Sequence, residues 1–295
     1  MPASVRSSFP PAWAGVWICK DAGGHIQATG RDEKGRKQYR YHADWTEHRS
    51  TTKFHTLTDF AKALPALRQQ VESDLRRRSL GYERVVASVV WLLDNSLIRV
   101  GNPAYARQNK SFGLTTLRNR HVEITGSTLR LNFKGKSGKE WRLQLTDRRI
   151  AKLLRSLQDM PGQHLFQYES DAGRCAISSR DVNDYIAAFA GPGFTSKTFR
   201  TWAASVRAFG LFASTELPET KTAQARTINA VIDQVAAKLG NTRAVCRRSY
   251  IHPAVPEAWQ KGELRRSGRL AGIEGLDEDE VETAGFLRRL ARRQA

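Results

Sequence analysis

Apolar residues recur every three or four positions over two long stretches of the chain, residues 56–78 and 81–101. This spacing places apolar side chains on one helical face and therefore predicts two amphipathic helices. Thr58 is the expected N-cap of the first helix, and Gly101 is the expected stop of the second. Helical spacing returns in five later segments, at residues 147–158, 179–190, 196–209, 222–239 and 284–293. The charged segment before the last of them, residues 262–282, is expected to be a surface connection.

Period-two alternation marks two other parts of the chain. "HIQATG" and "KQYRY" alternate around an "EKG" turn, which predicts a β-hairpin near the start. "SFGLTTLR", "HVEIT", "TLRLNFK" and "EWRLQL" are separated by "TGS" and "GKSG" turns and predict a small antiparallel sheet. The change of pattern predicts a domain boundary near residue 52. The expected fold class is α+β, with a small β-rich N-terminal domain (1–52) and a larger, mainly helical domain (53–295).

The charge of the chain indicates a polyanionic partner. Its 295 residues include 48 Lys and Arg against 29 Asp and Glu, a formal net charge of +19. Such an excess causes self-repulsion that nucleic acid, or less readily an anionic membrane surface, would offset. The longest apolar run, residues 85–93, is too short to span a bilayer, and the first residues contain no export signal.

The cysteines indicate the compartment. Cys19, Cys175 and Cys246 are odd in number and widely separated, which argues against a disulfide framework and against a zinc site. No Asp, Glu and His cluster has the spacing of metal ligands. A cytoplasmic protein without a metal or a small-molecule cofactor is therefore expected.

Three basic residues are candidates for anion binding, and each has a structural alternative. Arg99 follows an apolar helix and could simply interact with the helix dipole. Lys136 lies at a hairpin tip, where lysines commonly favour solubility. Arg200 lies between Phe199 and Trp202 at a helix start, where backbone N–H groups favour anions, although it could instead stack on Trp202.

Tyr250 is the candidate nucleophile, in "GNTRAVCRRSYIHP". A single tyrosine is more often a half-buried core aromatic, and the neighbouring arginines are then a solvated face. A phenol with a pKa of about 10 is mostly protonated at neutral pH, but dense cationic surroundings favour the phenolate. Two guanidiniums in fixed geometry would also oppose the charge that develops when a phosphodiester is attacked.

Five segments in order, "IRVGNPAY", "GLTTLRNRHVEI", "FKGKSGKEW", "KTFRTWAASV" and "LGNTRAVCRRSYIHP", resemble the type IB DNA topoisomerases of the small, poxvirus-like kind found in bacteria. "HIQATGRDEKGRKQYRYH" is similar to the DNA-clamping domain of that family. The resemblance covers roughly residues 10–260. It implies an ATP-independent isomerase that relaxes supercoiled duplex DNA, needs no obligatory metal and acts as a monomer associated with the nucleoid.

The resemblance also implies catalytic roles. Tyr250 would attack the DNA phosphodiester to form a 3′-phosphotyrosine and release a 5′-hydroxyl. Arg99 and Arg200 would brace the non-bridging phosphate oxygens, and Lys136 would protonate the leaving oxygen. Asn241 stands where much of the superfamily has histidine, so a smaller contribution is expected from its amide.

Duplex-binding residues follow from the same resemblance. Gln38, with one set of aromatic side chains, is expected to face a groove while basic neighbours meet phosphates. The implied contacts are Gln38, Tyr39, Tyr41 and Tyr105, with Lys197 as an auxiliary donor. The two domains would form a C-shaped DNA clamp, in which the cut strand rotates.

One feature departs from the family and two alternatives remain. Met1 lies only eight residues before Phe9, so either the N-terminal domain is abbreviated or the start of the sequence is misassigned. A tyrosine recombinase shares the nucleophile but usually has histidine at the position of Lys197 and a helical N-terminal domain. A non-catalytic basic DNA-binding protein would explain the charge, but not the joint presence of the basic residues and Tyr250.

Overall fold

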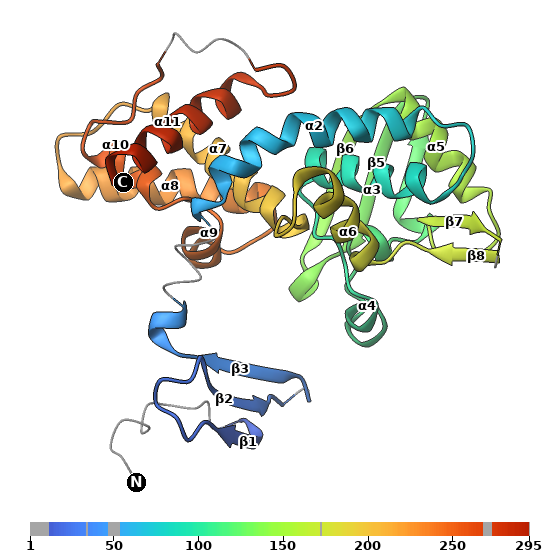
Figure 1. The fold of residues 1–295 in the computed structure, drawn as a ribbon, viewed down its shortest axis with the longest axis horizontal. Coiled ribbons are helices and arrows are strands. Elements are labelled where there is room, and N and C mark those ends of the chain that lie inside the picture. The colour runs from blue at the N-terminus through green and yellow to red at the C-terminus, as the bar shows by residue number, and fades with distance from the viewer. Residues whose placement is uncertain (1–11, 34, 47–53, 172, 268–272, 295) are drawn as a thin grey trace. The chain divides into compact units, whose positions relative to one another are not determined.

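The computed structural model describes residues 12–33, 35–46, 54–171, 173–267 and 273–294 (Figure 1). The chain forms two compact units, Met1–Thr56 and Leu57–Ala295. The predicted boundary at residue 52 lies outside the described residues. The described parts combine helices with small antiparallel sheets, which confirms the α+β class.

The N-terminal unit contains a three-stranded antiparallel sheet. Strand order is β1-β2-β3, and the predicted hairpin is present as β2 and β3, with Thr29 opposite Tyr39 and Gly30 opposite Gln38. Gly35 lies in the turn with φ +70°, a conformation that favours glycine. The strand bounds are β1 (Ala14–Ile18), β2 (Ile26–Arg31) and β3 (Lys37–Tyr41).

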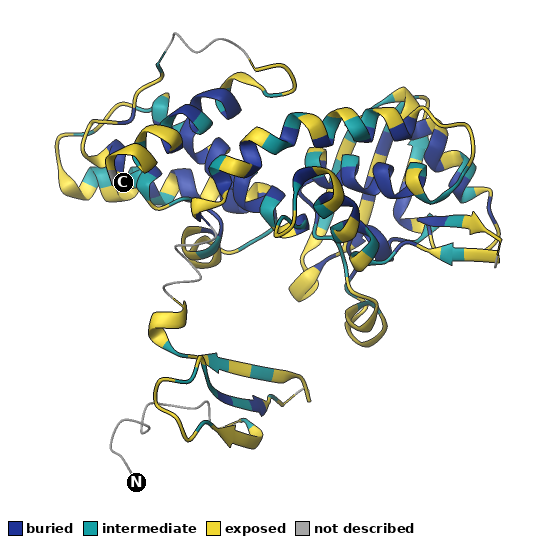
Figure 2. Ribbon diagram, in the orientation of Figure 1, coloured by how far each residue is buried: buried dark blue, intermediate teal, exposed yellow. Residues whose placement is uncertain are grey.

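The larger unit is mainly helical, as the apolar spacing predicts. Its described helices are α2 (Leu57–Leu75), α3 (Tyr82–Ser96), α4 (Pro103–Asn109), α5 (Arg148–Gln158), α6 (Ser179–Ala190), α7 (Ser196–Ala213), α8 (Lys221–Leu239), α9 (Arg243–Ser249), α10 (Ala254–Gln260) and α11 (Glu278–Gln294). Helices α2, α3, α6, α7 and α11 pack against one another. Buried positions concentrate in α3 and α7 (Figure 2), so α7 is a central element of the core.

The expected start of the first helix and the expected end of the second helix are both wrong. Thr58 lies inside α2, which begins at Leu57. Helix α3 ends at Ser96, because Leu97 takes a left-handed conformation with φ 58° and its N–H donates to the carbonyl of Leu93. A leucine in the left-handed conformation cannot be recognised as a helix end from the sequence, whereas the glycine at position 101 matched the usual signal for one.

A three-stranded sheet of order β4-β5-β6 lies in the larger unit, with bounds β4 (Val122–Thr125), β5 (Thr128–Lys134) and β6 (Glu140–Thr146). Alternate residues of β5 are buried, Leu129, Leu131 and Phe133, and α5 packs against this strand. "SFGLTTLR" is not a strand, since Leu114–Thr116 form a 3₁₀ turn.

Several short elements were not predicted. The hairpin of β7 (Gln167–Ser170) and β8 (Gly173–Ala176) and helices α4, α9 and α10 have seven residues or fewer each. Such lengths contain too few periods for a pattern to be recognised. Helix α11 begins at Glu278, inside the segment expected to be a surface connection.

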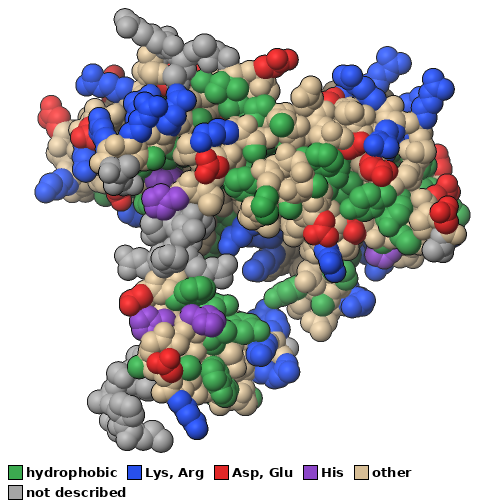
Figure 3. Space-filling view, viewed as in Figure 1, with side chains coloured by type: hydrophobic (Ala, Val, Ile, Leu, Met, Phe, Trp, Pro, Cys, Tyr) green, Lys and Arg blue, Asp and Glu red, His purple; other side chains and the backbone are tan. Residues whose placement is uncertain are grey.

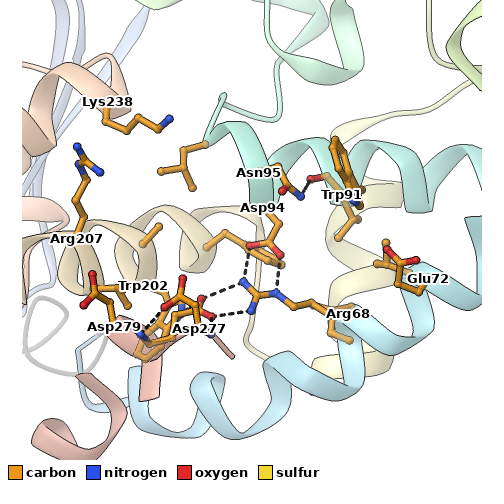
Figure 4. A pocket seen from close by; sticks show the side chains of 18 residues that line it. Arg68, Glu72, Trp91, Asp94, Asn95, Trp202, Arg207, Lys238, Asp277 and Asp279 are labelled. Atoms are coloured by element: carbon orange, nitrogen blue, oxygen red, sulfur yellow. Dashed lines mark hydrogen bonds and ion pairs between the residues drawn. The ribbon is translucent and has the colours of Figure 1, made fainter. Parts of the chain in front are cut away.

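A partly buried ion network joins the helices behind α7. Arg68 of α2 donates to Asp94 of α3 at 2.7 Å and to Glu280 of α11 at 2.7 Å. Glu280 also accepts a hydrogen bond from Trp202 Nε1 of α7 at 3.0 Å. These groups line a cavity of about 610 Å³ in which Arg68 lies between its carboxylate partners (Figure 4). The network therefore fixes α7 relative to α2, α3 and α11.

Candidate active site

Arg99 lies on a segment outside the helices and strands, which a neighbouring loop holds in place. The N–H of Leu114 donates to the carbonyl of Arg99 at 2.9 Å, and the N–H of Thr115 donates to Val100 at 2.7 Å. A Cβ on Gly113 would lie 2.5 Å from the Arg99 carbonyl oxygen, so only glycine permits this approach. Arg99 is three residues beyond α3, which removes the helix-dipole interpretation.

Arg200, the fifth residue of α7, is only 3 % exposed. Its guanidinium donates to the carbonyl of Leu97 and, at 2.8 Å, to the carbonyl of Leu239. One side chain thus ties together the ends of α3 and α8. Because carbonyls carry no net charge, the Arg200 charge stays uncompensated and would favour an anion beside it.

Tyr250 follows α9 and is 9 % exposed. Its ring belongs to the hydrophobic core, as the structural alternative supposes, yet Tyr250 also lines a pocket. Arg200 Cζ lies 5.2 Å from the centroid of the Tyr250 ring. Arg200 does not stack on Trp202, which was the structural alternative. The Trp202 indole instead donates a hydrogen bond to Glu280.

The electrostatic surroundings of Tyr250 favour its ionised form. Burial raises the pKa of the phenol, but the positive charges of Arg200, Arg99 and Lys197 outweigh burial. The pKa of Tyr250 is consequently lowered from its ordinary value near 10. A lowered pKa increases the fraction of phenolate, which is the nucleophilic form.

Asn241 joins the pocket through Arg99. Its Oδ1 accepts a hydrogen bond from the Arg99 guanidinium. Its Nδ2 is buried and makes no hydrogen bond to any described residue, and the same holds for Arg200 Nε. Buried donors usually have acceptors, so both atoms are available to an oxygen atom bound beside Arg99 and Arg200.

One pocket of about 290 Å³ brings most of the candidate catalytic residues together, whereas Asn241 is not part of its lining. Its lining includes Arg99, Tyr105, Lys136, Lys197, Arg200 and Tyr250. Within the described ranges, none of its four cationic side chains forms an ion pair with a carboxylate. The pocket therefore presents uncompensated positive charge around a phenol, which is the arrangement of a site that binds and attacks an anionic group.

The duplex-binding candidates divide between the two units. Tyr105 is in α4, at the pocket, and its side chain is 41 % exposed. Tyr39 and Tyr41 lie on β3 with their rings stacked 6.1 Å apart, and both are exposed. Gln38 lies on the other face of β3 and donates to Asp32 at 2.8 Å. Gln38 therefore does not share a face with the tyrosines, contrary to the expected common groove-facing set.

Sequence reasoning missed Ser205, which contacts the backbone at Tyr250. Its hydroxyl lies within donating distance of two carbonyls, Thr201 at 2.9 Å and Tyr250 at 3.2 Å, and it accepts from the His252 N–H at 3.0 Å. Phe112, which also lines the pocket, was missed as well. No local sequence pattern distinguishes either residue. The contacts of Ser205 with Tyr250 and His252 join segments 45 or more residues apart.

Metal ligands do not cluster in the part of the chain that the structure describes. The described residues contain no group of three or more His, Cys, Asp or Glu side chains that could hold a metal ion. None of the helices described is both long enough and apolar enough to traverse a lipid bilayer.

The fold and the pocket thus define a basic protein whose pocket places four cationic side chains around a phenol, and comparison with known proteins defines the family. The model of the eukaryotic DNA topoisomerase I catalytic core matches residues 42–265, and that of the bacterial DNA topoisomerase IB N-terminal domain matches residues 8–32. The chain belongs to the type IB DNA topoisomerase family, as the sequence motifs predicted.

Individual relatives agree with this assignment. The chain is 34 % identical to DNA topoisomerase 1B of Acanthamoeba polyphaga mimivirus over 260 residues, which cover 85 % of this chain and 77 % of the relative. It is 24 % identical to DNA topoisomerase 1B of vaccinia virus over 77 % of this chain and 70 % of the relative. DNA topoisomerase 1 of Mycosarcoma maydis is 29 % identical over 65 % of this chain, but only 21 % of that longer protein is matched.

Proposed function

We propose that this protein relaxes supercoiled duplex DNA by cutting one strand, with Tyr250 as the nucleophile. The observation that supports this most directly is the uncompensated positive charge around Tyr250 in one pocket. Tyr250 Oη attacks the phosphorus, the P–O5′ bond breaks, and a 3′-phosphotyrosine and a free 5′-hydroxyl result. After strand rotation, the 5′-hydroxyl attacks the phosphotyrosine, which restores the DNA strand and the phenol.

The two arginines supply the stabilisation of the transition state. Their guanidiniums would donate to the non-bridging oxygens, on which negative charge increases during attack. Arg200 Nε and Asn241 Nδ2 are buried donors that a phosphate oxygen would satisfy. Removing one preorganised donor of this kind costs about 10²–10³ in rate. Asn241 would contribute less than the arginines, because an amide is neutral.

Proton transfer balances the reaction. The proton of the Tyr250 phenol leaves before or during the attack, to solvent. The Lys136 ammonium donates a proton to O5′ as the P–O5′ bond breaks, and it recovers a proton from the 5′-hydroxyl in religation. The phosphotyrosine conserves the energy of the phosphodiester, so the cycle should need no ATP. Since cationic side chains surround the phosphate, we also propose that no added metal is required.

Binding of the duplex would involve both units. We propose that the N-terminal unit, through Tyr39, Tyr41 and Gln38, and the larger unit, through Tyr105 and Lys197, hold the duplex as a C-shaped clamp. A single chain would then suffice, so the protein should act as a monomer, and its substrate would place it at the nucleoid.

Relaxation of a supercoiled plasmid by purified protein tests the proposal. The assay should be run in EDTA and without ATP, and Tyr250→Phe should lose relaxation while keeping most DNA affinity, because only the attacking oxygen is removed. Tyr168→Phe, which removes the same atom from a tyrosine of β7 outside the pocket, is the matched control and should still relax the plasmid. Relaxation by the purified Tyr250→Phe protein would falsify the assignment.

A further inference from the structure

The indole ring of Trp141 lies between two glycines, each of which precedes a proposed site residue. A Cβ on Gly135, next to Lys136, would lie 2.7 Å from Trp141 Cδ1 and Nε1. A Cβ on Gly240, next to Asn241, would lie 2.6 Å from Trp141 Cζ2. Gly135 has φ −93°, which any residue can adopt, so the backbone does not demand glycine there. The close approach of the Trp141 ring is what requires glycine at this position.

Trp141 is also the outer member of a row of aromatic rings. It stacks on Phe133 with centroids 6.2 Å apart and ring planes within 4°. Phe133 lies 6.2 Å from His121, and His121 lies 4.4 Å from Phe112. Phe112 lines the pocket. The row therefore runs from the pocket, beneath the hairpin of β5 and β6, to the loop that contains Asn241.

Lys136 itself has little to hold it. Its side chain is exposed, and backbone hydrogen bonds alone close its turn: Gly135 N–H to Lys139 at 2.8 Å, Gly138 N–H to Gly135 at 3.1 Å and Lys139 N–H to Lys136 at 3.5 Å. Ser137 lies in the left-handed region with φ 63°. A general acid must come within about 2.6–3.2 Å of the oxygen that it protonates, so the place of this turn matters.

The Asn241 loop is anchored independently of Trp141. The N–H of Asn241 donates to the carbonyl of Ala236 at 2.9 Å, and its side chain accepts from Arg99. The position of Gly240 is therefore fixed independently of Trp141. The Trp141 ring in turn holds the Lys136 turn next to Gly240. Loss of the ring should consequently affect Lys136 more than Asn241.

We propose that Trp141 is a positioning residue, which seats the Lys136 turn against Gly240 and so directs the lysine ammonium to the leaving 5′-oxygen. This rests on the proposed function, in which Lys136 is the proton donor. A misplacement of about 1 Å can cost about 10²-fold in rate, so removal of the ring should slow strand cleavage strongly.

The leaving group of the DNA provides the test. Single-turnover cleavage is measured on a duplex with one mapped cleavage site, with either oxygen or sulfur as the bridging 5′ atom. A thiolate leaves without protonation, since thiol pKa values lie near 8.5, far below those of alcohols. Trp141→Ala should slow cleavage of the oxygen substrate about 10- to 100-fold and leave the sulfur substrate within about threefold of wild type. Trp141→Phe should lie between wild type and Trp141→Ala.

Controls separate positioning from general loss of structure and from failure of the proposed function. Trp91→Ala removes a half-buried tryptophan from the other cavity and should show no dependence on the leaving group. If Lys136→Ala slows both substrates equally, the assignment of Lys136 fails and the role of Trp141 fails with it. Suppose instead that the sulfur substrate restores cleavage by Lys136→Ala. The role of Trp141 alone is then overturned if Trp141→Ala cleaves the oxygen substrate at the wild-type rate, or if it cleaves both substrates slowly. Trp141→Phe serves equally if Trp141→Ala does not fold.

Discussion

Tyr250 combines two environments that usually exclude each other. Its ring packs with the core around α7 and α8, while Arg200 lies against the same ring. Core packing gives the phenol one fixed position, and the cations lower its pKa. In the proposed reaction, a nucleophile held in this way would need no rearrangement before attack.

The lowered pKa of Tyr250 leads to a pH prediction. Ionisation of the phenol makes cleavage faster as the pH rises, and the rate levels off once the phenolate predominates. Because the Lys197 charge helps to lower this pKa, Lys197→Met should raise it and shift the rate–pH profile to higher pH. Single-turnover cleavage measured across the pH range, with wild type alongside, gives the comparison. A profile that stays in place, or moves to lower pH, would contradict the electrostatic account.

Local sequence could not reveal all of the site's residues. The resemblance of ordered motifs pointed to Arg99, Lys136, Arg200 and Tyr250, and the structure places them around one pocket. Ser205 and Phe112 have no such signal, because each acts through contacts with distant segments. The pairing of Gln38 with Asp32 was equally hidden, since it depends on the β2–β3 turn.

At the scale of elements, long periodic segments were predictable and their ends were not. Strand β5 and helix α5 follow their patterns, and Asp147 caps α5 by accepting from the N–H groups of Arg149 and Ile150. The end of α3 instead depends on Leu97, whose carbonyl accepts from Arg200. A tertiary contact thus accompanies this boundary, and no window of local sequence contains it.

The ion network behind α7 makes a prediction about stability. Glu280→Gln keeps the side-chain volume but removes the charge that faces Arg68, so it should lower the free energy of unfolding by about 1.5–3 kcal/mol. Glu278→Gln is the matched control: its partner is Arg266, the Glu278 side chain is 84 % exposed, and the change should stay within about 0.5 kcal/mol. Urea denaturation measures both. Equal effects of the two substitutions would show that the network does not stabilise the packing of α7.

At the scale of the whole molecule, charge is the dominant property. The formal net charge is +19, and Lys and Arg side chains gather over the C-terminal helices on the face shown in Figure 3. Composition alone predicted a polyanionic partner, and family membership agrees with duplex DNA. The pattern of strands and helices also gave the α+β class, but it contained no information on which helices meet.

Charge also predicts how DNA binding responds to salt. Each phosphate contact releases counterions, so the logarithm of the binding constant should fall linearly with the logarithm of salt concentration, with a slope of about −0.9 per contact. Fluorescence anisotropy with a labelled duplex and the Tyr250→Phe protein separates binding from cleavage. A binding constant that hardly changes between low and physiological salt would contradict binding dominated by phosphates.

Mapping of the covalent DNA adduct tests the central claim most directly. Detergent added during plasmid relaxation traps the intermediate, and nuclease and protease digestion followed by mass spectrometry identifies the modified peptide. The account predicts a nucleotide joined through its 3′-phosphate to Tyr250, in EDTA and without ATP. An adduct on another residue, or one joined through a 5′-phosphate, would contradict it.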